Sequence, residues 1–108
     1  MIDNQKQVKT LIQLLKTNLP IPVMATDDLI NSLNKNNKTI SSDSHIQIED
    51  VLYMGDEGGI CCHLKIAGQK EVAVIVSLTH LRISNTHQLS SDVRAYQIAR
   101  TKKLAKNH

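Results

Sequence analysis

The amino-acid sequence predicts an α+β domain of two layers, in which helices cover one face of a three-stranded antiparallel meander, in the order α-α-β-β-β-α. Three observations carry this prediction. Apolar residues recur with a helical period near the start of the chain, and three apolar-rich segments lie between residues 45 and 80. Glycine-containing turns separate these segments, as in β-hairpins. A chain of 108 residues fits one domain, residues 1–108.

The first helix is predicted over residues 3–18. Its apolar side repeats at the i, i+3, i+4, i+7 spacing that is typical of a buried helix face. This side consists of Val8, Leu11, Ile12, Leu15 and Leu19. Pro20 and Pro22 end the helix, because proline lacks an N–H group and disfavours the α conformation in the residue before it. We expect the chain to run extended for a few residues after the helix.

Two further helices are indicated by their starting residues. Thr26 is suited to cap a short helix, and Asp27 and Asp28 stabilise its positive end. The polar residues 34–44 predict a surface loop. The final helix begins at Ser90 or Ser91 and runs to about residue 105.

The meander consists of residues 45–54, 60–67 and 71–80. Its predicted register pairs Met54 with Ile60 and Ile66 with Val72. Even-numbered residues then share one apolar face, which Asp50 interrupts. The expected core face is Ile46, Ile48, Leu52, Met54, Ile60, Cys62, Leu64, Ile66, Val72, Val74, Val76 and Leu78.

The odd-numbered face of the meander is half apolar. In the predicted register Val51, His63 and Ile75 form a row across the three strands, and Glu49 faces Lys65 as a cross-strand ion pair. An antiparallel sheet often leaves one face in water, but a row of this kind also fits an interface between two copies of the chain. We therefore expect a homo-oligomer, and take Val51, His63 and Ile75 as the candidate interface.

Composition argues against an aromatic core, a disulfide between the two cysteines and a membrane span. The chain has no Phe or Trp, so its core must be aliphatic. Cys61 and Cys62 are adjacent and would point to opposite faces of a strand, which makes a disulfide between them unfavourable. No apolar run approaches the length of a membrane span, and the first residues lack a signal-peptide core. We expect a cytoplasmic protein without a membrane partner.

The turn Gly-Asp-Glu-Gly-Gly is the first candidate for chemistry. The predicted register brings His80 close to Gly58, so that Asp56, Glu57 and His80 could hold a divalent cation or exchange a proton with a substrate. A solvated turn with a chance neighbour is the alternative interpretation. The glycines do not lead into a helix, as phosphate-binding loops do, and no motif indicates a cofactor.

The second candidate is the basic C-terminal helix, on which Lys102, Lys103 and Lys106 fall near one side and could bind phosphate groups. A net charge of +3 permits polyanion binding without requiring it. The leading hypothesis is a small non-enzymatic binding or assembly protein that self-associates through its sheet. The alternatives are a nucleic-acid-binding accessory protein that uses this helix, and a small metal-dependent enzyme at the Gly-Asp-Glu-Gly-Gly turn.

Overall fold

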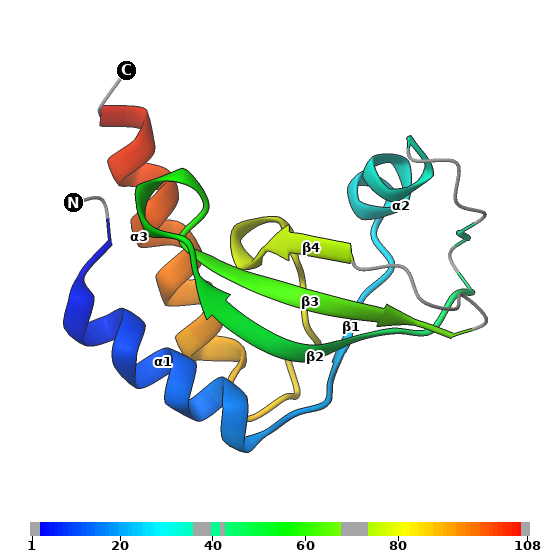
Figure 1. Cartoon of the computed structure of the whole chain (residues 1–108), viewed down its shortest axis with the longest axis horizontal. Coiled ribbons are helices and arrows are strands. Elements are labelled where there is room, and N and C mark those ends of the chain that lie inside the picture. The colour runs from blue at the N-terminus through cyan, green and yellow to red at the C-terminus, as the bar shows by residue number, and fades with distance from the viewer. Residues whose placement is uncertain (1–2, 36–39, 42, 68–73, 107–108) are drawn as a thin grey trace.

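The computed structural model describes residues 3–35, 40–41, 43–67 and 74–106, and has an α+β architecture (Figure 1). Along the chain the helices and strands are α1 (Gln5–Thr17), β1 (Ile21–Val23), α2 (Asp27–Asn34), β2 (Ile46–Tyr53), β3 (Ile60–Ile66), β4 (Val74–Ser77) and α3 (Ser90–Lys106). Short 3-10 helices follow β2 and β4, at Gly55–Glu57 and Leu78–His80. Within the described residues, no helix combines the length and the apolar character that crossing a membrane requires.

α2 begins after Thr26 as predicted, whereas α1 begins at Gln5, two residues later than predicted. The side chain of Asn4 accepts a hydrogen bond of 3.0 Å from the N–H of Gln7 at the start of α1. Thr26 caps α2 in the same way, with its hydroxyl 3.2 Å from the N–H of Leu29. Figure 1 shows α1 and α3 beside each other at one end of the sheet and α2 at the other end. We call α1 and α3 together the helix layer.

The sheet has four antiparallel strands in the order β1-β2-β3-β4, so the prediction of three strands was wrong by one. The additional strand is the extended segment after Pro20, in which Ile21 pairs with Ile48 and Val23 pairs with Ile46. The central residue of β1 is Pro22, which is exposed. A three-residue strand with a central proline is possible only at an edge of a sheet, and it gives almost no sequence signal.

The predicted pairing of Met54 with Ile60 was wrong, because Tyr53 pairs with Ile60 next to the turn. β2 also contains an irregularity between Ile48 and Asp50. Ile48 pairs with Leu64, but the next pair is Asp50 with His63, so one strand has an extra residue, as in a β-bulge. The side chain of Asp50 accepts a hydrogen bond of 2.8 Å from the N–H of Val51. Beyond this point the odd-numbered residues of β2 face the core. The break that Asp50 makes in the apolar pattern was the signal of this bulge.

The bulge changes which side chains are buried. Val51, predicted on the outer face, is 2% exposed, whereas Leu52 and Met54, predicted in the core, are 39% and 52% exposed. Residues 46 and 48 precede the irregularity and are buried as predicted. The observed pairing is shifted from the prediction by one residue in the second half of β2 and by two residues in the first half. A shift of two keeps each side chain on its predicted face, so the error in burial is confined to the second half of β2.

The register between β3 and β4 agrees with the prediction. Cys62 pairs with Val76 and Leu64 pairs with Val74, which is the alignment that a pairing of Ile66 with Val72 implies, although Val72 itself lies outside the described residues. β4, which corresponds to the predicted strand 71–80, ends at Ser77 rather than at residue 80. Ser77 accepts a hydrogen bond from the N–H of Thr79 and begins the 3-10 helix Leu78–His80.

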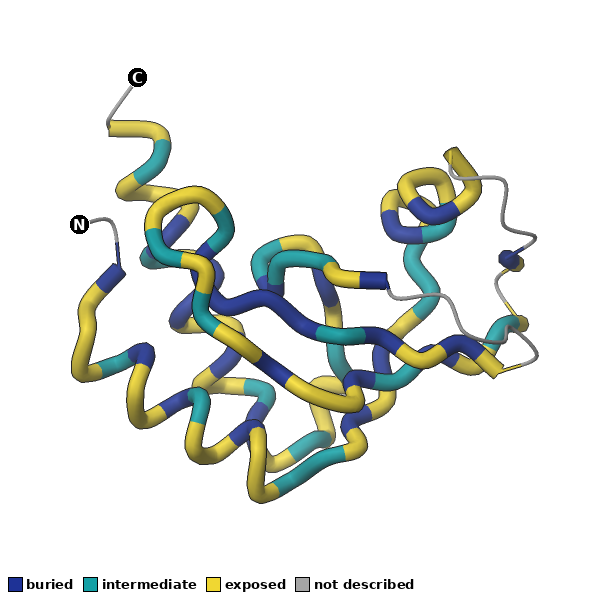
Figure 2. Tube along the Cα trace, viewed as in Figure 1, coloured by how far each residue is buried: buried dark blue, intermediate teal, exposed yellow. Residues whose placement is uncertain are grey.

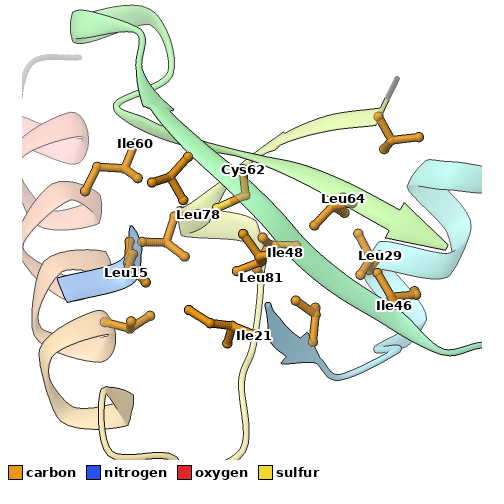
Figure 3. Packing of buried hydrophobic residues seen from close by; sticks show 14 of the residues in the cluster. Leu15, Ile21, Leu29, Ile46, Ile48, Ile60, Cys62, Leu64, Leu78 and Leu81 are labelled. Atoms are coloured by element: carbon orange, nitrogen blue, oxygen red, sulfur yellow. The ribbon is translucent and has the colours of Figure 1, made fainter. Parts of the chain in front are cut away.

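One cluster of buried side chains joins the helices and all four strands. Its members are almost all aliphatic, and Figure 3 shows Leu15, Leu78 and Leu81 packed against Ile21 and Ile48. Figure 2 shows the buried residues along the inner elements and exposed residues along the outer sides of the helices. α1 packs against β2 and α3, and α3 packs against the 3-10 helix that follows β4.

Candidate functional site

The three residues of the predicted turn site lie in two short 3-10 helices, Gly55–Glu57 and Leu78–His80. Asp56 and Glu57 are exposed in the 3-10 helix Gly55–Glu57. His80 lines a cavity of about 210 Å³ together with Asp28 and Ser32 of α2. Ser77 of β4 contacts the turn, donating a hydrogen bond of 2.8 Å to the carbonyl of Gly58. Over residues 3–35, 40–41, 43–67 and 74–106, no three His, Cys, Asp or Glu side chains are grouped to hold a metal ion.

The predicted interface row is divided by the bulge. His63 and Ile75 pair across β3 and β4, and Ile75 is 55% exposed on the outer face of the sheet. Val51 is not part of that face, because it points into the core, and Asp50 pairs with His63 in its place. The predicted ion pair between Glu49 and Lys65 is present, with 3.7 Å between the charged atoms, although the residue directly opposite Lys65 is Gln47.

Both cysteines are free and buried, which makes thiol chemistry unfavourable. Burial raises the pKa of Cys62 to about 12, with a smaller contribution from Cys61. Burial also raises the pKa of Cys61, although Arg100 opposes the effect. The thiolate is the form that attacks electrophiles and binds metals, so neither side chain is prepared for these reactions near neutral pH.

A buried polar cluster at the start of the chain was not predicted. Arg100 Nη1 lies 2.7 Å from Asp3 Oδ2, and the two side chains are 4% and 2% exposed. The hydroxyls of Tyr53 and Tyr96 donate to the same oxygen, at 3.1 and 3.4 Å. The Tyr96 hydroxyl also accepts a hydrogen bond of 2.9 Å from the N–H of Ile60. We call Asp3, Tyr53, Tyr96 and Arg100 the clasp.

The clasp connects three distant segments: the N-terminus, the turn after β2 and α3. Arg100 Nη2 donates a hydrogen bond of 2.8 Å to the carbonyl of Asp56. Gly59 has φ +64°, and a Cβ atom at this position would collide with the Tyr96 hydroxyl and lie 2.9 Å from Arg100 Nη1. Burial is the main cause that raises the pKa of Tyr96 to about 12. Because each of the four side chains has a hydrogen-bond partner within the protein, the clasp is structural in character.

Gln97 makes a similar connection one position along α3. Its Nε2 atom donates to the carbonyls of Leu78 and Leu81, at 2.7 and 2.6 Å, and the residue is 2% exposed. The buried side of α3 therefore includes two strongly polar residues, and it consists of Val93, Tyr96, Gln97 and Arg100. In the sequence, Arg100 looks like one more surface charge of a basic helix, because nothing local to α3 reveals its partner.

The charges of the chain are segregated between its layers. Residues 1–18 and 90–108 contain eight of the thirteen Lys and Arg residues but only two of the ten Asp and Glu residues. One of these two acids is Asp3, which is buried against Arg100. The charged side chains exposed on α1 and α3 are Lys6, Lys9, Lys16, Arg94, Lys102, Lys103 and Lys106, against the single acid Asp92.

A hollow of about 540 Å³ lies between α1 and α3. Lys6 lines it from α1, and Asp92 and Ala95 line it from α3. Lys102 and Lys106 follow Ala95 by seven and eleven residues, so they lie on the same stripe of α3. The contact between Asp3 and Arg100 places the start of α1 beside the second half of α3. Lys6, Lys102 and Lys106 therefore present their charges on one side of the helix layer.

Comparison of the chain with protein-family models, with curated protein sequences and with solved structures finds no match.

Proposed function

We propose that this chain is a non-enzymatic nucleic-acid-binding protein whose helix layer contacts the phosphate backbone. The observation that carries the proposal is the segregation of charge, with seven exposed basic side chains and one exposed acid on α1 and α3. The remaining chain, residues 19–89, has five Lys and Arg residues against eight Asp and Glu residues. A basic surface on a molecule of low net charge orients a polyanion toward that surface.

The buried clasp strengthens the basic character of the helix layer. Asp3 would otherwise place a carboxylate beside Lys6 at the start of α1, but it is 2% exposed and neutralised by Arg100. Two glutamines and two threonines complete the exposed polar surface of α1, and α1 contains no acid: Gln5, Gln13, Thr10 and Thr17. Phosphate contacts by lysine are sequence-independent, which agrees with an accessory role.

The test is the salt dependence of binding to a fluorescently labelled oligonucleotide, followed by anisotropy. We expect binding at low salt that weakens with a linear dependence of log affinity on log salt concentration. The triple substitution of Lys102, Lys103 and Lys106 by Ala should reduce the slope by about 0.7–0.9 for each phosphate that the variant no longer neutralises. A control protein with Lys35→Ala and Lys65→Ala removes cations outside the helix layer and should bind as the unmodified chain does.

Two results would contradict the proposal. The first is the absence of measurable affinity at low salt for both single-stranded and double-stranded oligonucleotides. The second is an equal loss of affinity in the control protein, because this would show that any cation on the molecule contributes equally. Circular dichroism of each variant establishes that the fold is retained.

Self-association through the sheet is the second candidate function. Leu52, Met54 and Ile75 are three of the six large apolar residues that are exposed among the described residues, and all three belong to β2, β4 or the adjoining turn. Glu49, Asp50 and Lys65 give this side charges of both signs, so two copies could approach without net repulsion.

Sedimentation equilibrium tests the second candidate. If the outer face forms a dimer, Ile75→Glu should convert the dimer to a monomer. Ile98→Glu is the matched control, because Ile98 is 42% exposed on α3, away from the sheet. A monomeric unmodified chain at high concentration, or equal dissociation by both substitutions, would remove this candidate.

A further inference from the structure

A second hollow, of about 520 Å³, lies on the outer side of α1 where the helix meets the end of β2. Its apolar lining is Val8, Ile12 and Tyr53, and the polar residues around it include Lys9, Gln13 and Lys16. No acid lines the hollow among the residues that the structure describes. We call it the α1 groove. It combines an apolar floor with cationic sides.

The spacing of the two lysines defines what can occupy the α1 groove. Lys9 and Lys16 are seven residues apart, which is two helical turns, so their Cα atoms lie on one side of α1 at a separation of about 10 Å. Ile12 lies between them along the helix, and Tyr53 faces it from the end of β2. A ligand that fits must bring flat apolar groups to the floor and negative charges to both ends.

We infer that the α1 groove binds single-stranded nucleic acid, with a base on Tyr53 and Ile12 and the neighbouring phosphates on Lys9 and Lys16. The inference rests on the proposed function and specifies its substrate class. A single strand exposes both bases and phosphates, and a basic groove with an aromatic side chain is the usual arrangement for binding it. A duplex keeps its bases stacked inside, so it would contact the lysines but leave the apolar floor empty.

The position of Tyr53 is fixed before a ligand arrives. Its hydroxyl donates a hydrogen bond of 3.1 Å to Asp3, which Arg100 holds in turn. Burial and this hydrogen bond raise the pKa of Tyr53 further above physiological pH, where a phenol is already neutral and does not repel phosphate. A ring that is already ordered loses little conformational entropy when a base stacks on it. The clasp therefore holds the Tyr53 side chain in place at the α1 groove.

Tyrosine fluorescence provides a direct readout. The chain has no Trp and two Tyr residues, and Tyr96 is 1% exposed, so quenching by a stacked base reports on Tyr53. We expect a 12-nucleotide thymidine oligomer to quench the emission, and a 12-base-pair duplex to leave it unchanged after correction for absorbance. Tyr53→Leu should weaken binding of the single strand at least about tenfold, because stacking on the ring is lost. Tyr53→Phe keeps the ring and should retain most of the affinity.

A second pair of variants avoids any effect on the clasp. Gln13 is exposed in the groove, and Gln13→Glu places a carboxylate between the two lysines. Asn31→Asp introduces the same charge at an exposed position of α2 and is the matched control. We expect Gln13→Glu to weaken single-strand binding severalfold and Asn31→Asp to leave it unchanged.

The outcomes separate the inference from the proposed function. Preference for the single strand, quenching, and loss of affinity in Tyr53→Leu and Gln13→Glu support the inference. Binding of both nucleic acids with equal affinity, without quenching or sensitivity to these substitutions, overturns the groove and leaves the helix layer as the phosphate-binding surface. Absence of binding to either nucleic acid overturns both.

Discussion

Asp3 and Arg100, separated by 97 positions in the sequence, form an ion pair of 2.7 Å that is almost completely shielded from water. Two tyrosine hydroxyls donate to the same carboxylate oxygen, so the pair belongs to a network rather than standing alone. Burying two charges costs several kcal/mol, and close geometry with additional hydrogen bonds offsets this cost. The pair therefore specifies how the N-terminus and α3 meet more than it adds to stability.

Removing one partner of this pair should be strongly destabilising. Asp3→Ala leaves the Arg100 guanidinium buried without its carboxylate, and we expect a loss of about 3–5 kcal/mol in the free energy of unfolding. Glu49→Ala is the control, because it breaks the exposed ion pair with Lys65 and should cost at most about 1 kcal/mol. Urea unfolding followed by circular dichroism measures both. Equal effects would show that Arg100 reaches water when Asp3 is absent.

Two glycines with positive φ, Gly55 and Gly59, provide a matched pair. Gly55 has φ +68° with nothing within 4 Å of an added Cβ, whereas an added Cβ at Gly59 meets Tyr96 and Arg100. Gly55→Ala should cost only the backbone strain of the left-handed region, about 1–2 kcal/mol. Gly59→Ala should cost more than Gly55→Ala, because the clasp must also move. The comparison uses thermal and urea unfolding, and similar losses would exclude close packing of the clasp against Gly59.

Stability should fall in alkaline solution because of groups that are buried in their neutral form. The pKa values of Cys62 and Tyr96 rise from ordinary values of 9.0 and 10.0 to about 12 in the folded protein. The unfolded chain therefore loses these protons at lower pH than the folded chain does. Their contribution to stability is complete below about pH 9 and is lost progressively as the pH rises toward 12.

Urea unfolding at a series of pH values from 8 to 11 checks this dependence. The Cys62→Ala protein is less stable throughout because it has a cavity, but its stability should fall less steeply above pH 9, since one of the groups has been removed. An identical slope in both proteins would assign the alkaline loss to Tyr96 and other groups alone.

Local patterns in the sequence predict those parts of the fold that depend on neighbouring residues. Asn4 and Thr26 act within one helical turn, and Thr26 was predicted as a cap from its own position and the two acids after it. The register of β3 with β4 follows from alternation on two strands joined by a short connection. In these cases one uninterrupted period is enough to determine which side chains are buried.

The missed features depend on residues that are distant in sequence or on a change of period. β1 contains a proline and three residues, so its pairing with β2 has no periodic signal. Asp50 was noted as an interruption, but alternation was continued through it. The clasp brings Asp3 to Arg100 only after the whole chain has folded, and so these two charged residues looked like ordinary surface groups. The basic helix layer, in contrast, was partly visible in the C-terminal lysines.

The bulge in β2 leads to opposite expectations for two adjacent residues. If alternation continued through Asp50, Leu52 would be buried and Val51 exposed, but Val51 is 2% and Leu52 39% exposed. Val51→Ala should therefore lower the free energy of unfolding by about 1–3 kcal/mol, and Leu52→Ala by less than about 1 kcal/mol, although it removes the larger side chain. Urea unfolding of both proteins decides between the registers, because only a continuous strand makes Leu52→Ala the more damaging change.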